Sequence, residues 1–272
     1  MIRIGTGGIP ISSKERSTLS GLERLHELGL NCMEIEFVRG VYMKPELAEQ
    51  VGELAKKLKI RLSIHAPYYI NLTSTEKEKI EASKKRIIQS CERGHSMGAK
   101  IVVFHPAYYG KLSPEECYNL VKKECEDMAD KLREKGINDV VLGLETTGKF
   151  SQFGTVDECV HIVKEVKGCG VCVDWSHVYA RNQGKINFGE VIDKVLTLKN
   201  KHIHSHFSGI NYGMKGERNH LTLDSNQPKY NNLVKEINSR GLDITLISES
   251  PNLEEDALKL KSMIKGKKIF TL

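Results

Sequence analysis

Six side chains of metal-ligand types recur along the chain, each at the end of a short apolar run. They are His65, His105, Glu145, Asp174, His206 and Glu249. Imidazoles and carboxylates gathered in one place bring lone pairs and like charges together, which is costly unless a cation neutralises them. The residue types therefore indicate a metal centre if the fold brings the six side chains together.

The ligand types restrict the metal and the number of ions. Three histidines and three carboxylates without a thiolate suit Zn²⁺, Mn²⁺ or Fe²⁺, whereas Ca²⁺ and Mg²⁺ favour nearly all-oxygen shells. One Zn²⁺ takes about four ligands. More ligands than one ion can hold predict two or three ions, with Glu145 well suited to bridge two of them.

A second group of candidate ligands follows the first. His177 comes three residues after Asp174, in an expected loop above the strand, so it should serve a different ion. Glu217 and His220 of the segment KGERNHL, in the loop expected after the seventh apolar run, could complete that site. The spacing alone leaves open a solvated loop with a Glu–Arg surface pair.

The other histidines have simpler interpretations. His202, His204 and His206 alternate along one run and should point to the same side of a strand. Only His206 is expected at the strand tip, with His204 one layer deeper and His202 structural. His95 and His161 fall in helical stretches, where we expect surface or packing residues.

Eight short β-rich runs carry these residues at intervals of about 30 to 40 residues. The runs are 2–6, 32–37, 61–65, 101–105, 140–145, 171–174, 202–207 and 244–249. Helical periodicity lies between several of them, at 18–28, 46–58, 77–98, 119–136 and 157–166. Eight such units predict a single (β/α)₈ TIM barrel domain over 1–272, with its site at the C-terminal face of the strands. All six side chains would then converge.

An open doubly wound sheet is the alternative fold. Its usual signature is GxGxxG after the first strand, but this chain reads Gly5-Thr6-Gly7-Gly8-Ile9-Pro10, with proline in place of the third glycine. The barrel is therefore favoured.

The bulk composition is that of an ordinary globular protein, with 39% hydrophobic and 28% charged residues. The net charge of +6 permits a phosphate-bearing partner but does not require one. The start of the chain does not resemble a signal or transit peptide, and no run of about 18 apolar residues could cross a membrane. We expect a soluble, cytoplasmic protein.

Seven cysteines are an odd number, which argues against a disulfide framework. Cys169 and Cys172 form a CxxC without the second pair that a zinc knuckle needs. We expect two buried small residues on and before a strand, with a redox pair as the alternative.

Six motifs together resemble the endonuclease IV family of apurinic/apyrimidinic endonucleases, metal-dependent members of the xylose-isomerase-like barrels. They are HAPYYINL (65–72), FHPAYYG (104–110), LETTG (144–148), VDWSHVYARN (173–182), HFSG (206–209) and SESPNLEEDALKLK (248–261). Nearly the whole chain is covered, in the family's order.

The resemblance implies a trinuclear zinc site, with Mn²⁺ as a possible substitute. The six strand-end residues would hold two ions, with Glu145 bridging them and orienting the nucleophile as the catalytic residue, and His177, Glu217 and His220 would hold the third. The implied substrate is double-stranded DNA with an abasic site, cut by a monomer. Tyr68 matches a family position beside the DNA, or is a rim tyrosine with a hydrogen-bonded hydroxyl.

The chain departs from the family at two places. Family members usually have an acid and a histidine two residues apart at the third site, whereas here Arg218 and Asn219 separate Glu217 from His220. The family also tends to have a histidine soon after the first strand, where this chain reads GTGGIPIS.

The main rival function is a sugar isomerase or epimerase of the same barrel superfamily. Such enzymes hold one divalent ion, for which Glu145, Asp174, His206 and Glu249 would suffice. The surplus of histidines at 65, 105 and 177 favours the nuclease. A non-catalytic barrel that binds metal or nucleic acid is the third possibility.

Overall fold

The structure, a computed structural model, describes residues 1–264. Eight parallel strands close into a barrel in the order β1-β12-β9-β8-β6-β4-β3-β2, and β2 pairs with β1 to complete the ring. The barrel strands are β1 (Ile2–Gly7), β2 (Cys32–Glu36), β3 (Arg61–His65), β4 (Ile101–Phe104), β6 (Val141–Glu145), β8 (Cys169–Asp174), β9 (Ile203–Phe207) and β12 (Ile244–Ser248). The predicted TIM barrel is confirmed.

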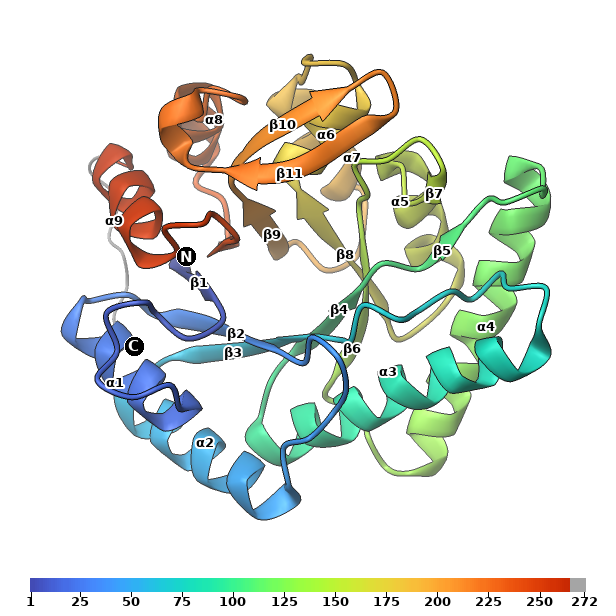
Figure 1. Cartoon of the computed structure of the whole chain (residues 1–272), viewed down its shortest axis with the longest axis horizontal. Helices are drawn as coiled ribbons and strands as arrows, with labels where there is room; N and C mark the ends of the chain where they lie inside the picture. Colours follow the sequence, from blue (N-terminus) through green and yellow to red (C-terminus); the bar gives the residue numbers. More distant parts are fainter. Residues whose placement is uncertain (265–272) are drawn as a thin grey trace.

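The helices lie around the outside of the barrel (Figure 1). They are α1 (Thr18–Glu27), α2 (Pro45–Leu58), α3 (Lys77–Met97), α4 (Pro114–Glu134), α5 (Val156–Glu165), α6 (Trp175–Arg181), α7 (Phe188–Val195), the 3₁₀ helix η1 (Leu223–Ser225), α8 (Asn231–Arg240) and α9 (Glu254–Met263). Capping boxes at Ser113 and Thr155 define where α4 and α5 begin. The single-domain span stays a prediction, and its last residues, 265–272, lie outside the described part.

Two small antiparallel pairs of strands lie at the C-terminal end of the barrel. One joins β5 (Ala107–Tyr108) to β7 (Gln152–Phe153), and the other is a hairpin of β10 (Gly209–Gly213) and β11 (Gly216–Leu221). In Figure 1 the hairpin extends over the barrel beside α6. Both pairs follow barrel strands, so they surround the end where the predicted ligands lie.

Two expectations about local structure were wrong. His177 lies in the first turn of α6 rather than in a loop, because the Asp174 side chain caps this helix by accepting a hydrogen bond from the His177 backbone N–H, at 2.7 Å. Glu217 and His220 lie on β11 rather than in a loop. β4 and β12 also end one residue earlier than expected, so His105 and Glu249 follow these strands directly.

Within residues 1–264, no helix has the length and apolar character required to span a membrane.

Candidate metal centre

Glu145 occupies the centre of a buried cluster at the C-terminal end of the barrel. Its side chain is 0% exposed. Its Oε2 atom lies 3.0 Å from His65 Nε2 and 2.9 Å from His105 Nε2. Its Oε1 atom lies 3.1 Å from His177 Nδ1 and 3.4 Å from His206 Nδ1. The two oxygens of Glu145 therefore face two different sets of histidines.

Three overlapping groups of candidate ligands form around this carboxylate. In each group, one ligand atom per residue lies within 4.8 Å of every other. The groups are His65, His105 and Glu145; then Glu145, Asp174, His206 and Glu249; and then Asp174, His177 and His220. The structure thus brings together all six side chains that end apolar runs, and His177 and His220 with them.

Asp174 and His177 share one short segment because Asp174 has two roles. Its Oδ1 atom accepts hydrogen bonds from the His177 backbone N–H and from Ser176 Oγ, at 2.7 and 2.5 Å. Its Oδ2 atom is buried with no hydrogen-bond partner among the described residues. One oxygen therefore begins the helix and the other remains available to a cation.

A β-bulge at Arg218 explains the unusual spacing of Glu217 and His220. Tyr212 pairs with Glu217 and Asn211 with Asn219, so that Arg218 has no partner on β10. Residues three apart point to opposite faces of a regular strand, but an extra bulged residue restores the same face. Both side chains accordingly reach His177.

Distances confirm that this hairpin faces the third ligand group. His177 Nε2 lies 3.5 Å from Glu217 Oε2 and 3.2 Å from His220 Nε2. Gly148, at the end of the LETTG motif, makes room for the contact, since a Cβ there would lie 2.6 Å from Glu217 Cβ and 3.2 Å from His177 Cδ2. All nine predicted ligands are therefore in or beside one cluster.

The electrostatics of the cluster suit divalent cations. Burial disfavours ionisation of Glu145, yet His105 and His206 hold the pKa of this carboxyl well below its usual range. The pKa of Asp174 is likewise lowered by His177 against the effect of burial. Both carboxylates are thus ionised acceptors.

Several atoms of the same cluster have no hydrogen-bond partner in the described chain and are available to a cation. Glu145 Oε1, Asp174 Oδ2 and His206 Nδ1 are buried and make no hydrogen bond to any residue in 1–264. Leaving such atoms unpaired is costly, whereas ligation of a cation would satisfy them. The donor set of imidazoles and carboxylates therefore fits the predicted class of metal.

Glu34 is a functional candidate that sequence reasoning missed. It lies on β2, fully buried, with Oε2 accepting a hydrogen bond from His204 Nε2 at 2.9 Å and Oε1 lying 2.6 Å from His206 Nε2. Burial opposes ionisation of Glu34, but the two histidines hold its pKa well below the usual range. His204 is one layer below the tip, as predicted, and its partner is this carboxylate.

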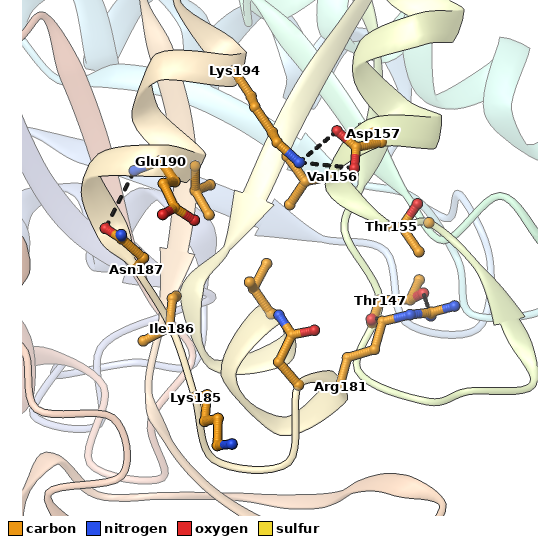
Figure 2. Close-up of a pocket in the computed structure, with 14 residues that line it drawn as sticks. Thr147, Thr155, Val156, Asp157, Arg181, Lys185, Ile186, Asn187, Glu190 and Lys194 are labelled. Carbon is orange, nitrogen blue, oxygen red and sulfur yellow. Dashed lines mark hydrogen bonds and ion pairs between the residues drawn. The ribbon is translucent and has the colours of Figure 1, made fainter.

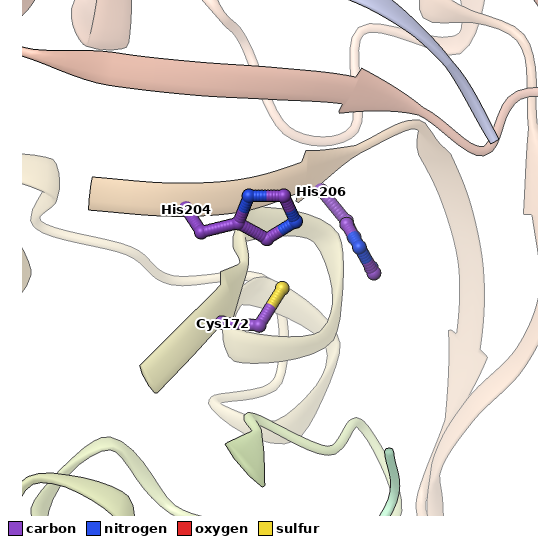
Figure 3. Close-up of side chains that lie close together, drawn as sticks. All are labelled: Cys172, His204 and His206. Atoms are coloured by element: carbon purple, nitrogen blue, oxygen red, sulfur yellow. The ribbon is translucent and has the colours of Figure 1, made fainter. Parts of the chain in front are cut away.

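Cys172 lies beside the same two histidines (Figure 3). Its Sγ atom and one nitrogen each of His204 and His206 lie within 4.8 Å of one another. Burial raises the pKa of the Cys172 thiol well above its usual value, so it remains neutral and is a poor metal ligand. All seven cysteines are free.

Glu36, at the end of β2, is a second residue that sequence reasoning missed. A cavity of about 310 Å³ above the cluster is lined by Gly7, Glu36, His65, Tyr68, His105, His177, Glu217, His220, Glu249 and Leu253. Burial raises the pKa of Glu36 to about 8. Because Glu36 ends an ordinary-looking strand, only the barrel geometry reveals that it faces this cavity.

A larger cavity, of about 590 Å³, lies between α5, α6 and α7 and contains none of the predicted ligands (Figure 2). Three of its charged side chains, Arg181, Asp157 and Lys194, are engaged with other protein groups. Arg181 donates to the carbonyls of Lys149 and Gln152, and Lys194 pairs with Asp157 at 2.7 Å. Size alone is thus a poor guide here, and the smaller cavity is the functional candidate.

Large apolar side chains gather on the rim of the barrel mouth. Of the ten exposed ones in the described chain, eight lie on segments that follow barrel strands: Ile11, Val38, Tyr42, Tyr68, Tyr69, Tyr108, Phe150 and Met214. Tyr68 is 58% exposed, and its ring centroid lies 5.9 Å from that of His65. Tyr68 therefore lies on the rim next to the ligand cluster, and its contact with DNA stays a prediction.

The same rim carries exposed cations. They are Lys14, Arg16, Arg39, Lys111, Lys149, Lys215 and Arg218. None of them makes an ion pair with a described residue, whereas several lysines on the outer helices do. The surface around the cavity therefore has unpaired positive charge and exposed aromatic rings.

Comparisons with known proteins agree with this architecture. An uncharacterized protein of Methanocaldococcus jannaschii is 41% identical over 96% of both chains. A probable endonuclease 4 of Aquifex aeolicus is 26% identical over 76% of this chain and 78% of its own.

Solved structures share the fold. A D-tagatose 3-epimerase-like protein matches with a TM-score of 0.71 and 21% identity, covering 96% of each chain. Endonuclease IV from Thermus thermophilus matches with a TM-score of 0.68 and 21% identity, covering 96% of this chain and 97% of its own. A family model described as xylose isomerase-like TIM barrel matches residues 22–266. With its closed barrel and its clustered ligands, the chain belongs to the xylose isomerase-like TIM barrel family, and the resemblance inferred from its motifs is confirmed.

Proposed function

We propose that the protein is a metal-dependent apurinic/apyrimidinic endonuclease, which cleaves the phosphodiester 5′ to an abasic site and leaves a 3′-hydroxyl, as in base excision repair. One observation carries the proposal. Three ligand groups overlap at the barrel mouth, and together they offer more imidazoles and carboxylates than a single ion can bind.

The residues around Glu145 would divide among two or three zinc ions, with Mn²⁺ as a possible substitute. His65 and His105 would bind one ion, and Asp174, His206 and Glu249 would bind a second. Glu145 would contribute a ligand to both ions. His177, Glu217 and His220 would serve the third. Bound divalent cations supply Lewis acidity at a phosphoryl oxygen and lower the pKa of water. Glu145, ionised and central, would orient the nucleophile.

The rim would bind the duplex around the lesion. Its unpaired lysines and arginines would contact flanking phosphates, and the exposed ring of Tyr68 would stack against the nucleotides beside the flipped-out sugar. An abasic nucleotide leaves the helix at low cost, since no base pair has to be broken. Action as a cytoplasmic monomer stays a prediction.

A divalent-metal sugar isomerase or epimerase is the second candidate. The group Glu145, Asp174, His206 and Glu249 would suffice for one ion, and the similarity to an epimerase-like structure supports it at the level of the fold. That function leaves the remaining histidines and the aromatic, cationic rim without a role.

The test is metal analysis combined with a nicking assay on a duplex containing one abasic site. We expect more than one zinc or manganese ion per chain and a single nick 5′ to the lesion. Glu145→Ala should reduce nicking by orders of magnitude, whereas Cys169→Ser, on the same barrel but outside the ligand groups, should not. One ion or fewer, together with sugar epimerisation and no nicking, would support the second candidate instead.

A further inference from the structure

Glu36 lies in the wall of the candidate site but outside the three overlapping ligand groups. Its side chain lines the cavity beside Gly7, Tyr68 and Glu249. Its Oε1 atom is buried and has no hydrogen-bond partner within residues 1–264. Glu36, Glu34 and Glu249 form a further group in which one oxygen of each lies within 4.8 Å of the others, and none of these carboxyl groups adds an N–H donor. A bound molecule that offers a hydroxyl would remove the cost of this unpaired oxygen.

Gly7 makes the position of Glu36 possible. A Cβ at Gly7 would lie 3.2 Å from Glu36 Oε1 and 3.5 Å from Glu249 Cγ, which is tight for any larger residue. Gly7 belongs to the segment GTGGIPIS, near which the endonuclease IV family tends to have a histidine. This wall of the cavity therefore has a carboxyl group from β2 and no imidazole from the segment after β1, and both should affect which ligand groups it prefers.

We propose that Glu36 is a specificity-determining residue that binds the C1 hydroxyl of the abasic sugar. The inference rests on the proposed endonuclease function. In duplex DNA the phosphates and ring oxygens only accept hydrogen bonds, and the internal 3′ and 5′ oxygens are esterified. The ring-closed abasic sugar alone has a free hydroxyl, on the carbon that has lost its base. A hydroxyl can donate to a carboxylate or accept from a carboxylic acid, so the pairing holds in either state of Glu36.

The dimensions of the site agree with this role. At about 310 Å³ the cavity is near the lower limit of small-molecule sites, which suits a single sugar unit. A site that hydrogen-bonds a hydroxyl rejects an analogue lacking it, because its own polar group is then left unpaired. One hydrogen bond to a charged group corresponds to roughly 10- to 100-fold in kcat/KM.

The test compares two duplexes that differ only at the lesion. One contains the natural abasic sugar, and the other contains tetrahydrofuran, which has no C1 hydroxyl. We expect the wild-type protein to prefer the natural lesion by roughly tenfold or more in kcat/KM. Glu36→Ala should remove this preference, because only cleavage of the natural lesion should become slower. Glu36→Gln keeps an acceptor oxygen and should retain part of the preference. Glu53→Ala, exposed on α2, is the matched control.

Metal content gives the second readout, and each outcome has a distinct meaning. Retention of the wild-type metal content by Glu36→Ala and Glu36→Gln supports a contact with substrate. Loss of a metal equivalent would make Glu36 a ligand and overturn the inference, as would equal slowing on both duplexes or a wild-type protein without preference. If the metal-loaded wild-type protein nicks neither duplex, the endonuclease function fails and this inference fails with it.

Discussion

Glu34 shows how a residue below the cluster can determine the chemistry of a candidate metal ligand. Its ionised carboxylate accepts a hydrogen bond from His204 Nε2, and its other oxygen lies 2.6 Å from His206 Nε2. A carboxylate at that distance favours a proton on His206 Nε2. Nδ1, which faces Glu145 and Glu249 at 3.4 and 3.2 Å, would then be the nitrogen that binds a metal ion.

Glu34→Gln should therefore weaken metal binding without removing any ligand. The amide retains the shape of the side chain but offers only one acceptor, so one histidine loses its partner. We expect roughly 10- to 100-fold weaker affinity for the ion held by His206, measured by titration of the chelator-treated protein with Zn²⁺. Circular dichroism checks that the variant folds, and Glu53→Gln on α2 is the control. An unchanged affinity would show that Glu34 has only a packing role.

At this scale the sequence predicted the ligands better than the residues that support them. The six strand-end side chains stand out because each ends an apolar run and all are ligand types. Glu34 and Glu36 do not stand out, since alternating glutamates in CMEIEF look like the polar face of an ordinary strand. Glu34 finds its partner His204 at a separation of 170 residues, across the barrel interior. No local pattern reports such a contact.

At the scale of elements, the short connections were the part that could not be predicted. Periodicity placed the strands to within two residues, because buried parallel strands are short apolar runs. The spacing of Asp174 and His177 does not show that Asp174 caps a helix as well as being a candidate ligand, so the first turn of α6 looks like a loop in the sequence. The bulge in β11 could not be inferred, because it depends on the residues opposite, on β10.

The role of the bulge can be tested by changing the number of residues in β11. Deleting Arg218 leaves Glu217 and His220 two positions apart, and residues two apart share a face of a regular strand. We expect this variant to bind as many zinc ions per chain as the wild type. Inserting one alanine between Asn219 and His220 should turn His220 to the opposite face of the strand. This variant should then bind one zinc ion fewer per chain than the wild type. Elemental analysis after dialysis distinguishes the two, and equal metal contents in both variants would contradict the role of the bulge.

At the scale of the whole molecule, composition does not reveal which groups surround the mouth of the barrel. Eight units at regular spacing were enough to predict closure of the barrel. A net charge of +6 says nothing about where the excess lies. The structure shows unpaired cations and exposed aromatic rings around the mouth. Lysines at the opposite end, such as Lys56 and Lys59, also make no ion pair with a described residue, so it is the aromatic rings and the clustered ligands that distinguish the mouth. A mouth with these groups together suits a large polyanion that covers it.

Charge reversal at the mouth should therefore change the salt dependence of DNA binding. Lys111→Glu, Lys149→Glu and Lys215→Glu together remove three rim cations. The matched variant changes Lys56, Lys59 and Lys100 to glutamate as well. These three lysines are exposed at the opposite end of the barrel. Both variants have the same formal net charge, so any difference between them reports the location of the charge and not its amount.

The measurement is fluorescence anisotropy of a labelled abasic duplex, in a Glu145→Ala background that keeps the DNA intact. Each lost phosphate contact should reduce the slope of log Kd against log salt concentration by about 0.9. We expect the mouth variant to lose between one and three such contacts and the opposite variant to retain the parental slope. Equal slopes in the two variants would place the duplex elsewhere. A parental protein whose binding is insensitive to salt would favour a small neutral sugar, because a neutral ligand releases no counterions.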